Sequence, residues 1–100
     1  MRVEDNPSAS RYELFVDGGV AGFAEYKLHD DRIELVHTEI GAGYEGAGLG
    51  SQLARAVLDD ARTRGLPVEP RCEFMAGYIA RHPDEYLELV VPEMREELGS

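Results

Sequence analysis

The sequence predicts a mixed α+β domain in which a three-stranded antiparallel meander is followed by a β-α-β-α-β segment. Two patterns support this fold class. Residues 12–40 contain runs of strand-forming residues separated by turn sequences, and residues 50–61 change to the spacing of an amphipathic helix. A chain of 100 residues has room for one hydrophobic core rather than two. We therefore expect one domain over residues 1–100, ordered from about residue 11 to residue 91.

The meander is predicted from β-branched and aromatic residues with partial alternation. Its strands are expected over residues 12–16, 20–28 and 32–40. The turns at residues 17–19 and 29–31 consist of Gly, Asp and His residues that suit tight hairpins. Residues 4–10 are polar and contain Pro7, so we expect this stretch to be frayed rather than to form an element.

An amphipathic helix is predicted over residues 51–64. Its apolar residues recur three and four positions apart and so share one face, and Gly65 with Pro67 ends it. These apolar positions are Gly50, Leu53, Ala54, Val57, Leu58 and Ala61. Residues 66–72 then predict a short strand, and such a strand–helix–strand connection gives parallel pairing through a right-handed crossover.

The remaining chain predicts one more helix and one more strand. The helix runs from Glu73 to about Arg81 and ends before Pro83, because the residue preceding a proline disfavours helical backbone. Residues 86–91 are apolar enough for a last strand, and residues 92–98 form either a short helix or a tail.

A glycine-rich loop joins the third strand to the amphipathic helix. Residues 41–50 contain five of the eleven glycines of the chain. Glycine allows positive φ and a close approach of the backbone to a ligand, and the unpaired amides of the following helix favour an anion. The loop therefore predicts a phosphate-binding site, with a plain surface turn as the alternative when the loop is taken alone.

Two nucleotide-binding motifs fit this loop less well. A P-loop needs a lysine before its Ser or Thr, and Ser51 follows a glycine instead. A dinucleotide fingerprint is matched by Gly41, Gly43 and Gly46, with Glu69 where a ribose-binding acid belongs. That fold needs two βαβ halves, however, and a meander occupies the place of one. Dinucleotide binding therefore stays the weaker alternative.

The chain is acidic, with 20 acidic and 10 basic residues and a formal net charge of −10. This charge disfavours nucleic acid as a partner. It suits either a solubilising surface or the attraction of a small amine or a basic peptide.

Cysteine and histidine spacing and the apolar runs exclude several other classes. Cys72 is the only cysteine, so no internal disulfide can form, and His29, His37 and His82 lack zinc-ligand spacing, so no metal is expected. The chain has neither the pattern of a signal peptide nor an apolar run that could span a membrane. We expect a cytoplasmic protein that is a monomer or a weak homodimer.

Two motifs resemble those of the GNAT acyltransferase superfamily. The stretch from Glu45 to Gly50, followed by a helix, resembles its pyrophosphate-binding motif (Gln/Arg)-x-x-Gly-x-(Gly/Ala). Gly48 and Gly50 match this motif, whereas Glu45 replaces the usual Gln or Arg. A second motif, Pro70-x-Cys72-x-Phe74-x-x-x-Tyr78-x-x-x-His82-Pro83, is similar to small stand-alone GNAT-like proteins that are labelled predicted acetyltransferases. The resemblance covers roughly residues 11–90.

The resemblance implies a sheet that splays apart after the third strand, with coenzyme A in the gap. The pantetheine arm would run along the backbone near Glu39 and Ile40, and the pyrophosphate would lie on the amides of residues 46–51. The residues expected to bind acetyl-CoA are Glu39, Ile40, Glu45, Gly46, Ala47, Gly48, Leu49, Gly50 and Ser51. Glu45 places a carboxylate near the diphosphate, which weakens binding unless its side chain points to solvent.

The reaction that the resemblance implies is acetyl transfer from a thioester to an amine. It needs a neutral amine, stabilisation of the oxyanion and a proton for the departing thiolate. Four residues are candidates for these roles. Cys72 precedes a helix whose N-terminus would stabilise a thiolate that carries the acetyl group or lies beside the thioester; a small buried thiol is the alternative. Tyr78 would protonate the thiolate, as the resemblance implies, or else pack with Phe74 in the core. His37 and Glu39 share a strand face and would accept the amine proton, or else are simply solvated.

These observations predict an acetyl-CoA-dependent N-acetyltransferase with an unidentified amine acceptor. The alternative from another class is a coenzyme A or acyl-CoA binding protein that engages a basic partner with little or no turnover. Both bind the same ligand, and only turnover separates them.

Overall fold

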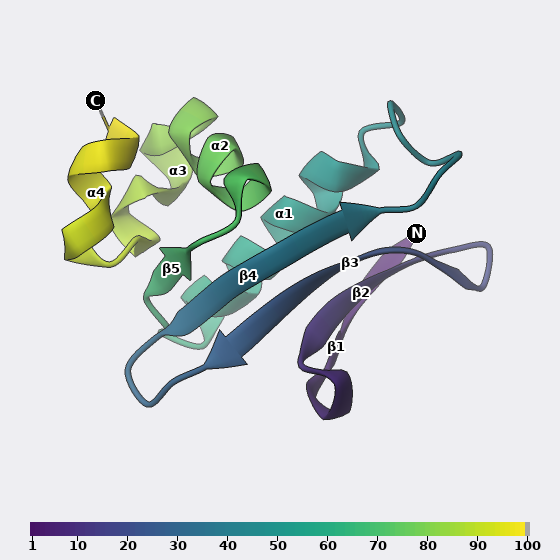
Figure 1. Ribbon diagram of the computed structural model, residues 1–100, viewed down its shortest axis with the longest axis horizontal. Coiled ribbons are helices and arrows are strands. Elements are labelled where there is room, and N and C mark those ends of the chain that lie inside the picture. The colour runs from purple at the N-terminus through teal and green to yellow at the C-terminus, as the bar shows by residue number, and fades with distance from the viewer. Residues whose placement is uncertain (100) are drawn as a thin grey trace.

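The computed structural model describes residues 1–99, which contain a mixed sheet in the order β1-β2-β3-β4-β5 (Figure 1). The strands are β1 (Arg2–Asn6), β2 (Arg11–Val16), β3 (Gly19–Leu28), β4 (Ile33–Ile40) and β5 (Val68–Pro70). The first four pair antiparallel, and β5 pairs parallel to β4. The predicted fold class, an antiparallel meander with a parallel addition, is confirmed.

The N-terminal residues form a strand, so the expectation of a frayed stretch over residues 4–10 is wrong. β1 pairs with β2 along its whole length, and the short 3-10 helix η1 (Pro7–Ala9) makes the turn between them. The side chain of Asp5 accepts a hydrogen bond from the hydroxyl of Tyr26 at 2.6 Å and lies 3.6 Å from Arg64. Backbone pairing and these polar contacts hold this edge strand in place. It therefore needs no alternating apolar residues, and the sequence shows no strand pattern there.

Helix α1 (Leu49–Thr63) covers one face of the sheet, where it contacts β3 and β4, and lies behind β4 in Figure 1. Its buried residues are Leu53, Ala54, Val57, Leu58 and Ala61, as the apolar spacing predicts. They share one core with Leu14, Ala24 and Leu35 of the sheet. Burial of each Leu or Val side chain contributes roughly 1.5–3 kcal/mol, so this face attaches α1 to the sheet. In the view of Figure 1, the front face of β2 to β4 carries no helix among residues 1–99.

The chain beyond β5 is helical. The predicted second helix is confirmed as α2 (Glu73–Arg81). The strand predicted over residues 86–91 is wrong, because α3 (Pro83–Tyr86) and the 3-10 helix η2 (Leu87–Leu89) occupy most of it.

The reason for this difference is the local sequence at the start of α3. Pro83 at the first position and Asp84 and Glu85 in the first turn favour helix initiation. Tyr86 and Val90 are buried four residues apart, and Val90 makes only an isolated bridge to Val68. Residues 92–98 lie in helix α4 (Pro92–Gly99), the helical one of the two alternatives. No helix within residues 1–99 is long and apolar enough to cross a bilayer.

The sheet splits between β4 and β5. The two strands pair only from Ile33 to Leu35, and the carbonyl of Leu35 accepts hydrogen bonds from the amides of Arg71 (2.9 Å) and Cys72 (3.1 Å). Residues 36–40 of β4 then continue beside β3, whereas the segment that follows β5 turns away into α2. The split therefore begins after Leu35, within the third strand of the predicted meander.

Candidate active site

The loop between β4 and α1 has the backbone conformation that its glycines predict. Gly46 and Gly48 have φ of 82° and 76°, which other residues rarely adopt. A Cβ atom on either glycine would meet nothing within 4 Å. The loop thus exposes its backbone to open space at the start of α1, as a close approach by a ligand requires.

The N-terminus of α1 offers unpaired backbone donors. Gly48 is its N-cap residue, and the first bond within the helix runs from the amide of Gln52 to the carbonyl of Gly48 at 3.2 Å. The amides of residues 49–51 therefore have no partner inside the helix. No side chain caps this end and no acidic residue lies in its first turn. The positive end of the helix dipole remains free to attract an anion.

A cavity of about 410 Å³ lies against this helix end, between β4 and α2. It is lined by Thr38, Ile40, Tyr44, Glu45, Gly46, Gly48, Gly50, Ser51, Phe74 and Arg81. Of the residues predicted to bind acetyl-CoA, Ile40, Glu45, Gly46, Gly48, Gly50 and Ser51 line this cavity, whereas Glu39, Ala47 and Leu49 do not. Its volume is in the usual range for small-molecule sites.

Phe74 and Arg81 were not among the predicted ligand-binding residues. A Cβ atom on Gly50 would lie 2.8 Å from Cζ of Phe74, so the second glycine of the motif lets the first turn of α1 pack against α2. Phe74 stands in the second quoted motif, which could have signalled it. Arg81, seven residues later on the same helix, had no signal in the sequence.

Cys72 lies at the split in the sheet, next to a cavity residue. Its Sγ is 3.4 Å from Oγ1 of Thr38, and it is the half-buried N-cap residue of α2. Because Thr38 lines the cavity, the thiol is one side chain removed from the predicted ligand site. The structure thus brings the two quoted motifs, one on the loop and one on α2, to the same place.

This arrangement has counterparts among known proteins. Residues 11–89 match the GCN5-related N-acetyltransferase family. The chain belongs to this family. Its glycine loop, cavity and split sheet are therefore those of a GCN5-related N-acetyltransferase, and the resemblance noted in the sequence is confirmed.

The relatives of this chain include proteins that are longer than the segment they share with it. Protein NATD1 of Mus musculus is 33% identical over 61 residues, which cover 60% of this chain and 56% of NATD1. Streptothricin acetyltransferase of Streptomyces lavendulae is 36% identical over 64 residues, which cover 62% of this chain and 34% of that enzyme. The chain thus spans about half the length of NATD1 and a third of the streptothricin enzyme.

A solved structure has the same fold. A GCN5-like protein of Staphylococcus aureus, described as a candidate N-acetyltransferase and determined by NMR, superposes with a TM-score of 0.65. The match covers 90% of this chain and 87% of that protein at 21% sequence identity. At this identity the likeness concerns the fold, which it confirms.

His37 and Glu39 lie on the other side of the acetyltransferase sheet from the cavity. Their side chains are 52% and 61% exposed, and Nε2 of His37 is 3.3 Å from Oε1 of Glu39. The structure brings these two together but keeps them apart from Cys72, because Thr38 and Ile40 alternate with them toward the cavity. A bulge leaves Val36 of β4 unpaired. This bulge sets the side chains of Thr38 and Ile40 toward the cavity and those of His37 and Glu39 toward the opposite face.

Tyr78 is buried in the core of the fold. Its ring stacks on His82 with centroids 4.3 Å apart, and its hydroxyl accepts a hydrogen bond from Nη2 of Arg55 at 3.3 Å. It does not line the cavity, and no hydrogen bond within residues 1–99 joins it to Cys72. Its expected role as a proton donor stays a prediction.

Glu69, the acid that fitted a dinucleotide fingerprint, is engaged elsewhere. Its buried carboxylate accepts hydrogen bonds from Nε of Arg32 and Nε of Arg71, and these two bonds lower the pKa of Glu69. It lines a different cavity from that of the glycine loop. The geometry therefore gives the dinucleotide alternative no ribose-binding acid.

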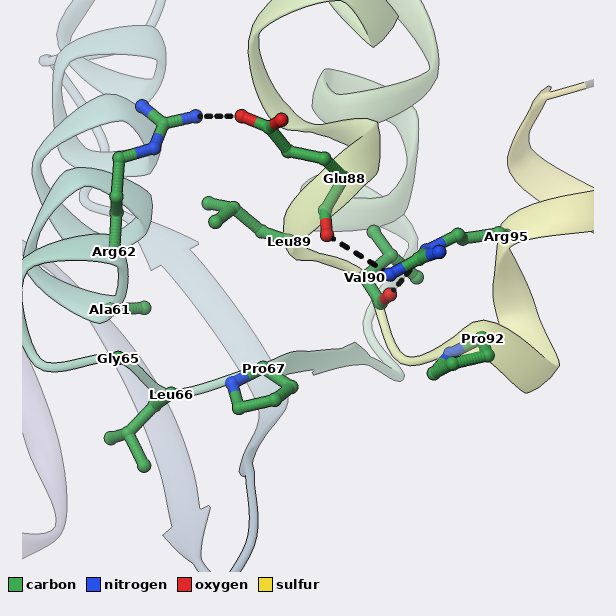
Figure 2. Close-up of a pocket in the computed structure, with 10 residues that line it drawn as sticks. All are labelled: Ala61, Arg62, Gly65, Leu66, Pro67, Glu88, Leu89, Val90, Pro92 and Arg95. Carbon is green, nitrogen blue, oxygen red and sulfur yellow. Dashed lines mark hydrogen bonds and ion pairs between the residues drawn. The ribbon is translucent and has the colours of Figure 1, made fainter.

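A further cavity, of about 350 Å³, lies at the C-terminal end of α1 (Figure 2). Two guanidinium groups line it. Arg62 pairs with Glu88 at 3.2 Å, and Arg95 donates to the carbonyls of Val90 (2.9 Å) and Glu88 (3.2 Å). Both cations are already engaged, so this cavity does not offer the free positive charge of an anion site.

Proposed function

We propose that this chain transfers the acetyl group of acetyl-CoA to an amine. One observation carries the proposal: the start of α1, with its unpaired amides, and Thr38, whose hydroxyl contacts the thiol of Cys72, border the same cavity, where the sheet has split. The first feature suits a diphosphate, and the second would lie beside the thioester. Membership of the GCN5-related family supports the same reaction.

The residues of the cavity fit acetyl-CoA. The amides of residues 49–51 would hold the diphosphate, with Gly46 and Gly48 leaving room for it. Ile40 and Phe74 offer apolar surface to the pantetheine arm beside the unpaired edge of β4. When bound, acetyl-CoA supplies a thioester that is activated toward attack. The exposed carboxylate of Glu45, which also lines the cavity, opposes the diphosphate.

The amine would approach from the open face of the sheet. The cavity occupies the helix side of β4, and His37 and Glu39 lie on the face without a helix. The amine nitrogen forms the new bond to the acetyl carbon, the bond from carbon to sulfur breaks, and the coenzyme leaves as a thiolate that takes up a proton. The proton that the amine loses would pass to the His37–Glu39 pair.

The acceptor is proposed to be a small amine or a basic peptide, attracted by the net charge of −10. The expected cytoplasmic location and the monomeric or weakly dimeric state belong to the same proposal.

Calorimetry and a thiol-release assay test this function. Acetyl-CoA and NAD are titrated separately, and acetyl-CoA is then incubated with polyamines, amino acids and basic peptides as acceptors. We expect binding of acetyl-CoA, no binding of NAD, and thiol release with at least one acceptor. Binding without turnover would favour the coenzyme A binding protein, and absence of binding would overturn both.

A further inference from the structure

Arg81 differs from the other arginines that line cavities of this fold. Arginines line four cavities, and all except Arg81 donate hydrogen bonds to a carboxylate or a carbonyl. These bonds join Arg11 to Glu13, Arg32 and Arg71 to Glu69, Arg62 to Glu88, and Arg95 to the carbonyls of Glu88 and Val90. Within residues 1–99, Arg81 alone among them is an exposed cation without a partner, and it lines the cavity of the glycine loop.

The position of the Arg81 side chain is set by a glycine on its own helix. Gly77 lies one turn before it in α2, where a glycine costs about 1 kcal/mol of helix stability relative to alanine. A Cβ atom on Gly77 would lie 3.3 Å from Nη1 of Arg81 and within 4 Å of no other residue outside its own helix backbone and neighbours. The guanidinium therefore folds back over Gly77 toward the N-terminal part of α2, which carries Phe74.

An anionic ligand in this cavity would need a positive charge to offset the carboxylate that lines it. The loop motif has Glu45 where a Gln or Arg is usual, so one carboxylate lines the cavity and no basic residue comes from the loop itself. Arg81 is the basic residue among the lining residues. A guanidinium offers several donors in a plane that match phosphate oxygens.

We propose that Arg81 binds the diphosphate of coenzyme A and supplies, from α2, the positive charge that Glu45 fails to supply from the loop. This inference rests on the proposed function. Loss of one charge-assisted contact in a partly solvated site corresponds to an affinity loss of about five- to fiftyfold.

Calorimetric titration of coenzyme A into wild type, Arg81→Gln, Arg81→Lys and Lys27→Gln tests the assignment. Lys27 is the matched control, because it is an exposed cation on β3 that lines none of these cavities and has no hydrogen-bond or ion-pair partner within residues 1–99. We expect a five- to fiftyfold rise in Kd for Arg81→Gln, a smaller rise for Arg81→Lys and no change for Lys27→Gln. Circular dichroism verifies that each variant is folded.

Ligand fragments identify the phosphate. Dephospho-CoA lacks the 3′-phosphate but keeps the diphosphate, so Arg81→Gln should weaken it as much as it weakens coenzyme A. Pantetheine has no phosphate, so wild type and variant should bind it equally. A wild-type affinity in Arg81→Gln, or a loss that vanishes with dephospho-CoA, would refute the assignment while the proposed function stands. No binding of coenzyme A by wild type would refute the proposed function itself.

Discussion

The hydroxyl of Thr38 and the thiol of Cys72 lie 3.4 Å apart across the split in the sheet. Thr38 belongs to β4, beyond its last pair with β5, and Cys72 begins α2. The contact joins the two walls of the gap that forms where strand pairing stops. It also places the only cysteine of the chain beside the cavity of the glycine loop.

Cys72→Ala should lower acetyl transfer by at least about tenfold while the affinity for coenzyme A changes by less than about twofold, because in the proposed complex the thiol would lie near the thioester rather than the diphosphate. Iodoacetamide should modify wild type, and bound coenzyme A should protect it. Intact mass after mixing with acetyl-CoA separates two roles: an acetyl adduct on wild type only indicates a covalent step, and its absence indicates a positioning role. A fully active Cys72→Ala would rule out both.

Gly48→Ala and Gly18→Ala form a matched pair. Both glycines have positive φ, 76° and 83°, and at both a Cβ would meet nothing within 4 Å. Each substitution should cost about 1–2 kcal/mol of unfolding free energy from left-handed backbone alone. Only Gly48→Ala should also weaken coenzyme A binding, because only Gly48 lines the cavity. Urea denaturation and calorimetry measure the two effects; equal affinities in the two variants would contradict the site.

His37→Gln should reduce kcat/KM for the amine about tenfold or more without changing the Kd of coenzyme A, because His37 lies on the face of β4 from which the amine is proposed to approach. His29→Gln is the control, since His29 also pairs with a glutamate, Glu34, at 2.9 Å, but near the β3–β4 turn. Steady-state kinetics with a reactive acceptor makes the comparison. Equal rates for both variants would exclude His37 as the proton acceptor.

Two buried tyrosines should make the fold sensitive to alkali. The pKa values of Tyr26 and Tyr86 rise from 10.0 to about 12 because burial disfavours the phenolate and because their hydroxyls donate to Asp5 and Asp59. The unfolded chain loses these protons near pH 10, whereas the folded protein keeps them. This contribution to stability is therefore complete below pH 10 and is lost as the pH rises through about 12.

Urea denaturation from pH 9 to pH 12 measures how steeply the free energy of unfolding falls with pH. Tyr86→Phe removes one of the titrating groups, so its unfolding free energy should fall less steeply with pH than that of wild type. Identical slopes for the two proteins would show that Tyr86 does not contribute.

The sequence by itself determined the elements whose signals are local. The spacing of Leu53, Val57 and Ala61 specifies one buried face of a helix wherever that helix packs. The glycines before it specify a loop that only positive φ can close. Both features depend on residues close in the chain, so the glycine loop and the helix that follows it were predictable.

Only the tertiary structure decided the features that depend on distant partners. β1 is polar, and it is a strand because β2 and Tyr26 bind it. The bulge at Val36 turns Thr38 rather than His37 toward the cavity, which depends on how β3 and β4 register. Arg81 lines the same cavity as the glycine loop because the core packs α2 against α1 and Gly77 leaves space for the guanidinium. The alternation and spacing of residues along a chain carry no information about these tertiary contacts, since the free energy that stabilises them arises between residues far apart in sequence.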